Sequence, residues 1–263
     1  MTSPAIQLPK TCRVLTTPMA MIDYAGAVVL TQEWAKDRSR PYGVSATNTH
    51  GIALARHDPQ FRSCLDQFDL NCPDGMPIVW YMNWQAPAMG VEPLKDRVYG
   101  PTFMLRCLEQ SGDQFSHFFL GGSEELLAEL KSKLQMRFPQ LRVAGTYSPP
   151  FGQWSPEENE RIFEAIRASK ADYIWVGLGC PKQESWIGSN KDRLPPGVYV
   201  AVGAAFAFHA GRTRQAPMWV QSNGLEWAYR ILTEPRRLFK RYVTYISLLL
   251  FYLVWDRIAR RPE

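Results

Sequence analysis

Asp74 is a carboxylate placed where a general base would be needed. The Pro73-Asp74-Gly75 sequence directly follows the short segment Leu70–Cys72, and an acid at the end of a strand can take a proton from a bound substrate. Pro-Asp-Gly is also ordinary turn chemistry, so Asp74 could instead be a turn residue with no catalytic task. The two interpretations differ in whether turnover needs the carboxylate.

Three further segments have a turn-like sequence directly after a strand-like run, which is where open α/β sheets bind ligands. Glycines in such turns let backbone amides approach a ligand, and the N-terminus of the following helix favours a phosphate. Each turn alone could simply close a βα unit, but three in one chain favour a nucleotide site. The segments are Thr47–Asn48, Leu120-Gly121-Gly122-Ser123 and Gly177–Glu184, the last containing Gly179, Pro181, Gln183 and Glu184.

Motifs for several other chemistries are missing from the sequence. It has no G-x-x-x-x-G-K-[ST] for P-loop phosphoryl transfer, no G-x-G-x-x-G after the first predicted strand, and no G-x-S-x-G. The four histidines show no metal-ligand spacing, and no Asp-x-Asp is present to bind a metal-complexed nucleotide sugar. We therefore expect no metal site, and an epimerase or dehydrogenase is disfavoured.

The C-terminal segment combines a basic face with an apolar run. On a helix, Arg237 and Arg241 would lie within about 20° of Arg230, although Pro235 interrupts the pattern. The uncharged run Tyr242–Trp255 would form a helix about 21 Å long, too short for a bilayer core of roughly 30 Å. A solvated basic face is one interpretation, and packing on a partner is another. The combination favours a helix lying in the interface of an anionic membrane.

Apolar, strand-like runs alternate with amphipathic helical segments along most of the chain. This alternation predicts βαβ units and a mostly parallel sheet covered by helices on both faces. The strand-like runs stop at Gly224, so we divide the chain into a catalytic α/β domain, residues 1–224, and a helical appendage, residues 225–263. The predicted strands are Gly43–Ala46, Phe115–Leu120, Leu141–Ala144, Tyr173–Leu178 and Val198–Val202, and one helix is predicted to start at Ser155 and Pro156.

Charge and cysteine content exclude several other classes of protein. The net charge of the 263 residues is +5, and residues 225–263 carry eight Lys/Arg and four acids, which leaves +1 for the rest. No basic stripe with interleaved aromatics runs through the body, so we expect no nucleic-acid partner. The five cysteines are odd in number and form no C-x-x-C pair, which argues for a reducing compartment and against a zinc or disulfide framework.

Taken in order, these segments resemble the WecG/TagA/CpsF glycosyltransferases. The resemblance covers roughly Gly43 to Tyr242, and its most specific parts are GLGCPKQE and GLEWAYRILTEPRR. The other matching pieces are TNTHGIALARHDPQF, NCPDGMPIVW, DRVYG, FFLGG, GTYSPPF, VAVGAAFAFHAG and QAPMW. The resemblance implies a Rossmann-like α/β fold of the family's own glycosyltransferase class, with a C-terminal appendage that meets the membrane and completes the active site.

The resemblance also implies an activity and roles for individual residues. The activity is an inverting transfer from a UDP-sugar to a sugar on a polyprenyl diphosphate, at the cytoplasmic face of the inner membrane, with no cofactor beyond the donor. Asp74 matches the base and Asn48 a polar residue beside it. Arg97, Arg230 and Arg237 match positions that stabilise the leaving diphosphate, a task for which guanidinium groups are suited. Gln183 and Glu184 match the nucleotide-side motif.

Departures from the family pattern leave the sugar open. Ala46 stands where the family often has Thr, Ala207 replaces the acid of an FDF sequence, and Gln215 replaces the Arg of RAP. The SPPF segment, Ser148–Phe151, favours the exopolysaccharide enzymes that add glucose, as in xanthan-type assembly. The alternative donor is UDP-N-acetylmannosamine or its uronic acid, used for teichoic acid or enterobacterial antigen. A nucleotide-binding scaffold docked through its tail is the competing hypothesis of another class, and the oligomeric state stays open.

Overall fold

A computed structural model describes residues 8–217, 219–220, 224–233, 247–248 and 251–252 of the chain, without the side chains of Trp227, Arg230 and Thr233. Strands and helices alternate through most of this part. The strands are β1 (Thr11–Val14), β2 (Thr17–Ala20), β3 (Pro41–Thr47), β4 (Leu70–Pro73), β5 (Ser116–Leu120), β6 (Arg142–Tyr147), β7 (Tyr173–Val176) and β8 (Gly197–Ala201). The helices are α1 (Tyr24–Asp37), α2 (Thr49–His57), α3 (Pro59–Asp66), α4 (Met76–Met89), α5 (Gly100–Ser111), α6 (Glu124–Arg137), α7 (Pro156–Ser169), α8 (Lys182–Ser189), α9 (Ala205–His209) and α11 (Glu226–Thr233).

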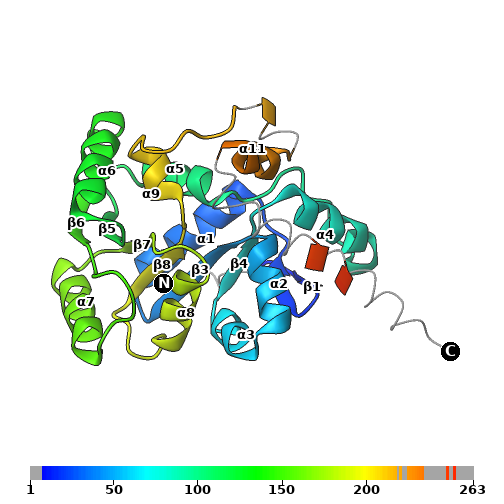
Figure 1. Cartoon of the computed structure of the whole chain (residues 1–263), viewed down its shortest axis with the longest axis horizontal. Helices are drawn as coiled ribbons and strands as arrows, with labels where there is room; N and C mark the ends of the chain where they lie inside the picture. Colours follow the sequence, from blue (N-terminus) through cyan, green and yellow to red (C-terminus); the bar gives the residue numbers. More distant parts are fainter. Residues whose placement is uncertain (1–7, 218, 221–223, 234–246, 249–250, 253–263) are drawn as a thin grey trace, which may run out of the picture.

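The main sheet has six strands in the order β4-β3-β8-β7-β5-β6, and every neighbouring pair is parallel. Three connections lead toward the β4 edge of the sheet: β3 to β4 through α2 and α3, β6 to β7 through α7, and β7 to β8 through α8. Two lead toward the β6 edge: β4 to β5 through α4 and α5, and β5 to β6 through α6. Figure 1 shows α3, α7 and α8 on one face of the sheet and α1, α5, α6 and α9 on the other. Opposite directions of travel on opposite faces give all crossovers the same hand, as expected for parallel sheets.

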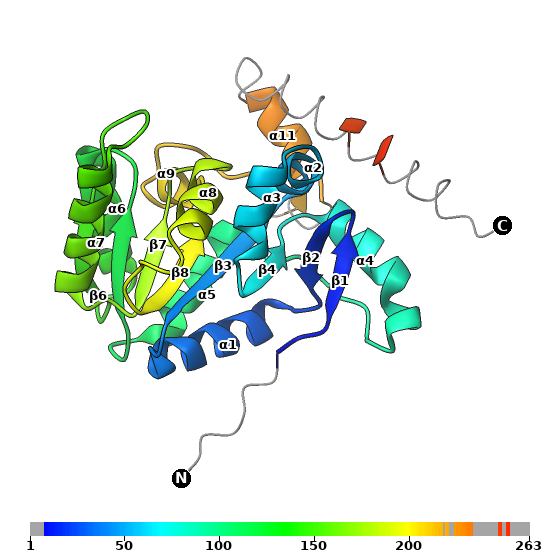
Figure 2. The same cartoon turned by 90° about the horizontal axis from the view of Figure 1, so that it is seen from below.

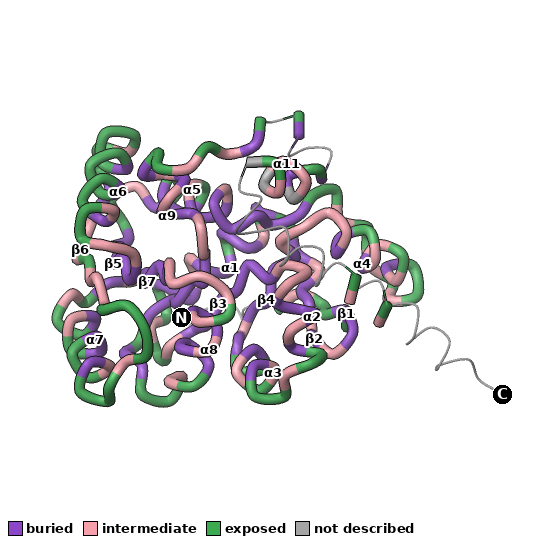
Figure 3. The backbone as a smooth tube through the Cα atoms, viewed as in Figure 1, coloured by how far each residue is buried: buried purple, intermediate pink, exposed green. Residues whose placement is uncertain are grey.

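Side chains of the central strands alternate between two cores. Along β7, Tyr173 and Trp175 enter the core under α1, α5, α6 and α9, while Ile174 and Val176 enter the core under α3, α7 and α8. Figure 3 shows these strands buried in the middle of the molecule and exposed residues on the outer helices. A strand buried on both faces reads as a continuous apolar run, which is why the sequence predicted β5, β7 and β8 closely.

A third, smaller core joins the N-terminal hairpin to α4. Strands β1 and β2 pair antiparallel, and their residues Val14 and Met19 pack with Ile52 of α2 and with Ile78 and Met82 of α4. Figure 2 shows the hairpin and α4 together beyond the β4 edge of the main sheet. This hairpin was missed in the sequence because its turn, at Leu15 and Thr16, has none of the usual turn residues; Leu15 takes a φ of 56°.

The predicted α/β class is confirmed: a mostly parallel sheet lies between helices. The predicted start of α7 is also confirmed, because Ser155 caps the helix by accepting a hydrogen bond from the backbone N–H of Glu158, with Pro156 at the first position. The expected strand Tyr173–Leu178 ends earlier, at Val176, since Gly177 begins the following turn.

The appendage begins with α11, and Leu225 directly precedes it. Pro235 and most of Tyr242–Trp255 lie outside the described residues, apart from residues 247–248 and 251–252. None of the helices in the described ranges combines the length and apolar character that crossing a bilayer requires.

We predict that Gly188→Ala destabilises the fold, because α8 packs so closely on α3 there. A Cβ at position 188 would lie 2.3 Å from the carbonyl oxygen of Cys64, so the two helices would have to separate. Such overpacking costs about 1–3 kcal/mol. The measurement is the free energy of unfolding in urea. Gly51→Ala is the matched control: its Cβ would meet Thr47 Cγ2 at an ordinary 3.5 Å, so stability should be unchanged or slightly higher.

Candidate active site

Asn48 and Asp74 lie side by side at the carboxyl ends of two adjacent strands. Thr47 and Pro73 are the last paired residues of β3 and β4, so the next residue of each strand leaves the sheet at the same point. The backbone N–H of Asp74 donates to the carbonyl of Thr47 at 3.0 Å, which fixes the start of the Asp74 turn against β3. The carboxylate predicted at a strand end therefore stands next to the predicted polar residue.

Asn48 has a structural task of its own. It is the N-cap of α2, and its Oδ1 accepts the backbone N–H of Gly51 at 3.1 Å. The amide also carries two donors on Nδ2, which is the end of the side chain suited to an anionic or hydroxyl ligand. Thr47, one of the residues predicted to bind the nucleotide sugar, is buried at the end of β3 with its hydroxyl donating to Ser45 Oγ.

A buried ion pair closes the site from the other side. Arg97 is held near Asp74 because the N–H of Val98 donates to the carbonyl of Pro73 at 2.8 Å. Its Nη2 lies 2.5 Å from Oε2 of Glu226 in α11, and the two side chains are only 8% and 6% exposed. Burial opposes the charge of Arg97, but the carboxylates of Glu226 and Asp74 outweigh it and raise the pKa of the guanidinium.

Two tyrosines support this segment. The hydroxyl of Tyr24 accepts the backbone N–H of Tyr99 at 3.0 Å, and the guanidinium of Arg97 lies over the Tyr99 ring at 4.6 Å. Burial, with a contribution from the charges of Asp96 and Asp74, raises the pKa of Tyr24 to about 12. Tyr24 therefore stays a neutral phenol that holds the Arg97 segment in place.

On the nucleotide side, Gln183 ties two loops together. Its Oε1 accepts the backbone N–H groups of Gly179, after β7, and Gly203, after β8, at 3.1 and 2.9 Å. Its Nε2 donates to Oε1 of Glu184 at 2.9 Å, and both side chains are 3% exposed. Gln183 and Glu184 thus shape the loops rather than project from them. Pro181, after a cis peptide, occupies the N-cap position of α8.

The two halves of the site meet at the first turn of α2. A Cβ on Gly51 would lie 3.9 Å from the sulfur of Cys180, so the α2 turn and the Gly179–Pro181 turn are neighbours. No heavy atom of a non-adjacent residue lies within 4 Å of where a Cβ on Gly179 would stand, and its φ is +80°. Among the described residues, none therefore occupies the position that a side chain on Gly179 would take.

Gly121 and Gly122 have packing reasons for being glycine. Gly121 has a φ of +114°, and a Cβ there would lie 2.9 Å from the backbone of Gly177. A Cβ on Gly122 would lie 2.6 Å from the side chain of Leu126. These contacts bring the loops after β5 and β7 together, so the two glycines are explained by the close approach of backbone whether or not a ligand binds there.

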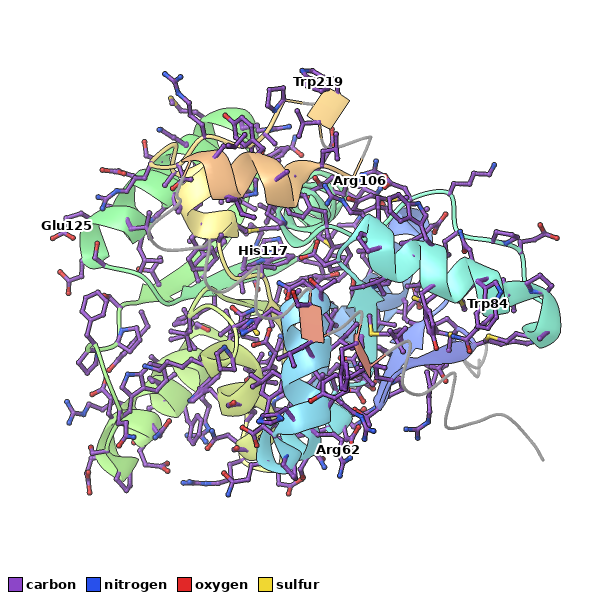
Figure 4. The ribbon with its side chains drawn as sticks, turned by 45° about the vertical axis from the view of Figure 1, so that its right-hand side comes forward. Arg62, Trp84, Arg106, His117, Glu125 and Trp219 are labelled. Atoms are coloured by element: carbon purple, nitrogen blue, oxygen red, sulfur yellow. The ribbon has the colours of Figure 1, made fainter. Side chains whose placement is uncertain are left out.

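Two of the four histidines, His117 and His209, take structural positions. His117 lies within the sheet (Figure 4), where its Nδ1 accepts the indole N–H of Trp175, and burial lowers its pKa to about 3. His209 contacts the carbonyl of Pro101, and burial lowers its pKa to about 4. Among the described residues, no three His, Cys, Asp or Glu side chains gather as they would around a metal ion. All five cysteines are free.

The remaining predicted arginines lie at or beyond the edge of the described chain. Arg230 belongs to α11, although its side chain is not described, and Arg237 lies outside the described residues. Glu226 was not among the predicted site residues. Its only signal in the sequence was its place in the GLEW segment, two residues beyond the domain boundary, and its partner Arg97 is 129 positions away.

Because the sheet is parallel, the first turns of α2, α4 and α8 all face the edge that carries Asp74. The unpaired N–H groups of these turns give that edge a positive partial charge, which suits a diphosphate. The arrangement thus combines a carboxylate able to accept a proton with an anion-binding edge. Figure 2 shows α11 at the same end of the sheet as α2.

Comparison with known families gives a match over nearly the whole chain. The model of the glycosyl transferase WecG/TagA/CpsF family matches residues 12–263, a range that contains every residue of the site described above. The chain therefore belongs to the WecG/TagA/CpsF family of glycosyltransferases.

Proposed function

We propose that this glycosyltransferase moves a hexosyl group from a UDP-sugar to a sugar carried on a polyprenyl diphosphate, with inversion and without a metal ion. The observation that carries the proposal is the placement of Asp74 beside Asn48 at the edge where the helix N-termini converge. An inverting transfer needs one base on the acceptor side and a cationic environment on the leaving-group side. A test of the whole proposal is incubation with a panel of UDP-sugars and a short-chain lipid diphosphate sugar, followed by mass analysis of the product.

In the proposed step, Asp74 accepts the proton of the acceptor hydroxyl. The acceptor oxygen forms a bond to the anomeric carbon as the bond from that carbon to the UDP oxygen breaks, so the configuration inverts and UDP leaves with the bonding electrons. Asn48 Nδ2 is placed to hold the acceptor or sugar hydroxyl beside the base. The amides at the start of α8 and α2 meet the charge that develops on the diphosphate.

Arg97 acts in this scheme through its neighbours. Its buried guanidinium is bound to Glu226, and its charge interacts with that of Asp74. We assign it to holding α11 over the site beside Asp74. Arg230 follows Glu226 by four residues, which places both on the same face of α11. Arg230, with Arg237, is therefore the better candidate for direct contact with the diphosphate.

Glucose is the sugar we propose, and exopolysaccharide synthesis the role. The support is the SPPF segment, which follows β6 at the ligand-binding edge. There Ser148 Oγ donates to the carbonyl of Gly122 at 2.7 Å, and Lys182 of α8 reaches the carbonyl of Gly152. This loop therefore adjoins the nucleotide-side helix. The place of action would be the cytoplasmic face of the bacterial inner membrane, with the appendage as a peripheral anchor.

Asp74→Asn is predicted to lose turnover, because the amide cannot accept the proton. Removing a positioned base typically costs about 10²–10⁴-fold in rate. The measurement is the transfer rate at saturating donor, alongside UDP binding and thermal stability, which should both stay near those of the parent. Asp66→Asn makes the same chemical change at an exposed position of α3 and should be silent. A normal rate for Asp74→Asn would make Asp74 only a turn residue.

Transfer is predicted to continue in excess EDTA. The reason is that the sequence has no Asp-x-Asp motif and that helix amides and arginines are available for the leaving charge. The rate should match that of untreated enzyme within error. Inhibition by EDTA that magnesium or manganese reverses would contradict the proposal of metal independence.

We predict that removing one partner of the Arg97–Glu226 pair lowers the free energy of unfolding strongly. Removing both charges should lower it by less than the two single changes added together. Removing one partner of a buried pair destabilises by about 3–5 kcal/mol, because the other charge is left without compensation. We expect Glu226→Leu and Arg97→Leu each to lower the free energy of unfolding on that scale, and the double variant to lose less than their sum.

The control for this cycle is the exposed pair of Arg212 and Glu129, where the same replacements should change stability little. Additive losses in the buried cycle would mean that the two side chains are not coupled. The double variant should still transfer slowly, since α11 would have lost its attachment beside the base.

A further inference from the structure

Helix α4 presents an uncharged face to its surroundings. Trp80 and Trp84 are 58% and 63% exposed, and Pro87 and Ala88 continue the same helical face. We call these four residues the α4 face. No charged residue occurs from Gly75 to Val91. A helix at the surface of a domain normally turns charged residues outward, so an apolar outer face marks a surface that meets something.

The internal packing of the protein does not need this face. The inward side of α4 is supplied by Ile78, Val79, Met82 and Ala86, all of which are buried. Trp84 projects from the outer side of α4, away from this packed side (Figure 4). The two tryptophans are therefore large apolar side chains kept at the surface by their position in the helix.

The α4 face is continuous with the C-terminal segment. A Cβ on Gly224, just before α11, would lie 2.8 Å from Met76 Cβ and 3.7 Å from the Trp80 ring. Further along the chain, Tyr252 packs on the small core shared by α4 and the hairpin. In the described ranges, ten large apolar side chains stand out as exposed, and five belong to α4 or the C-terminal segment: Trp80, Trp84, Leu225, Leu232 and Phe251.

Positive charges border this surface. Lys10 donates to the carbonyl of Met89 at the end of α4, and Arg13 of β1 accepts a hydrogen bond from Gln85 at its own carbonyl. Arg56 of α2 lies over the Tyr252 ring at 5.6 Å. The loop after α4 contains Glu92, Lys95, Asp96 and Arg97, whose charges sum to zero, so this loop does not offset the three cations.

We propose that the α4 face rests in the head-group region of an anionic lipid bilayer, as a second contact besides the basic C-terminal segment. Tryptophan favours this interface, because its ring is apolar and its N–H needs a polar partner. Bordering lysine and arginine side chains are attracted to anionic lipids. A second copy of the chain fits less well, since a symmetric contact would bring like-charged borders together.

The biological role of this membrane contact rests on the proposed function. Helix α4 begins two residues after Asp74. With its face in a bilayer, the base would stand close to the membrane surface, where an acceptor with a long hydrocarbon chain has its polar end. The contact itself is a property of the surface, however, and is measurable without any substrate.

The test is co-sedimentation of the full chain with vesicles of phosphatidylglycerol and phosphatidylcholine in equal parts, with no donor or acceptor present. We expect Trp80→Ser/Trp84→Ser to lower the partition coefficient at least about tenfold, equivalent to about 1.4 kcal/mol. Trp80→Phe/Trp84→Phe should stay within about threefold of the parent, because it keeps apolar rings. Met136→Ser/Phe151→Ser removes two exposed apolar side chains far from α4 and should bind like the parent.

Equal vesicle binding by the parent and by Trp80→Ser/Trp84→Ser would overturn the proposal. A parent that is dimeric by light scattering, with a monomeric serine variant and unchanged vesicle binding, would assign the α4 face to a second copy instead. Thermal unfolding of each variant checks that binding is compared between folded proteins. If the double serine variant does not fold, the single variant Trp84→Ser, at the more exposed of the two positions, takes its place and should also bind vesicles more weakly than the parent. Failure to transfer sugar to a lipid acceptor would count against the proposed function and would leave the vesicle result unaffected.

Discussion

The parallel direction of all six main strands governs where chemistry can occur in this protein. Each strand ends at the same edge, so Asn48, Asp74, Gly121, Gly179 and Gly203 come together although they are spread over 156 positions of the chain. The same constraint points the first turns of the following helices at this edge, with their partial positive charge. A single rigid edge of the sheet can then hold both a bound diphosphate and a carboxylate that acts as a base.

The buried pair of Arg97 and Glu226 adds what the sheet cannot supply, a fixed position for α11. Burying two charges is expensive, and their attraction offsets the cost only when the geometry is good, so such a pair is weak support for overall stability. Its effect here is to fix where α11 lies relative to the rest of the protein. Glu226 has one strong partner in the catalytic domain, and that partner is anchored by the Val98–Pro73 hydrogen bond next to Asp74. Helix α11 is thereby aligned with Asp74, the proposed base.

Much of the fold could be predicted from the sequence because burial on two faces leaves a plain pattern. Strands such as β7 are continuous apolar runs in the sequence, and Ser155 is recognisable as the N-cap of the helix that follows it. The hairpin could not be seen in this way, since Leu15 adopts a positive φ that is tolerated because its side chain is buried in the small core. Glu226 was missed for a different reason: local patterns say nothing about a partner brought near only by the fold.

Helix α4 connects Asp74, the small core of the hairpin and an exposed outer face, and its composition reflects these three roles. Its first turn follows the base, its inner face closes the small core with the hairpin, and its outer face carries two tryptophans. An ordinary amphipathic helix could perform the first two tasks with charged residues outside. The absence of charge over the whole helix is what the proposed bilayer contact would require. A surface of this kind beside the base is what an enzyme needs if its acceptor is anchored in lipid while its donor comes from water, since the base must then work at the boundary between the two.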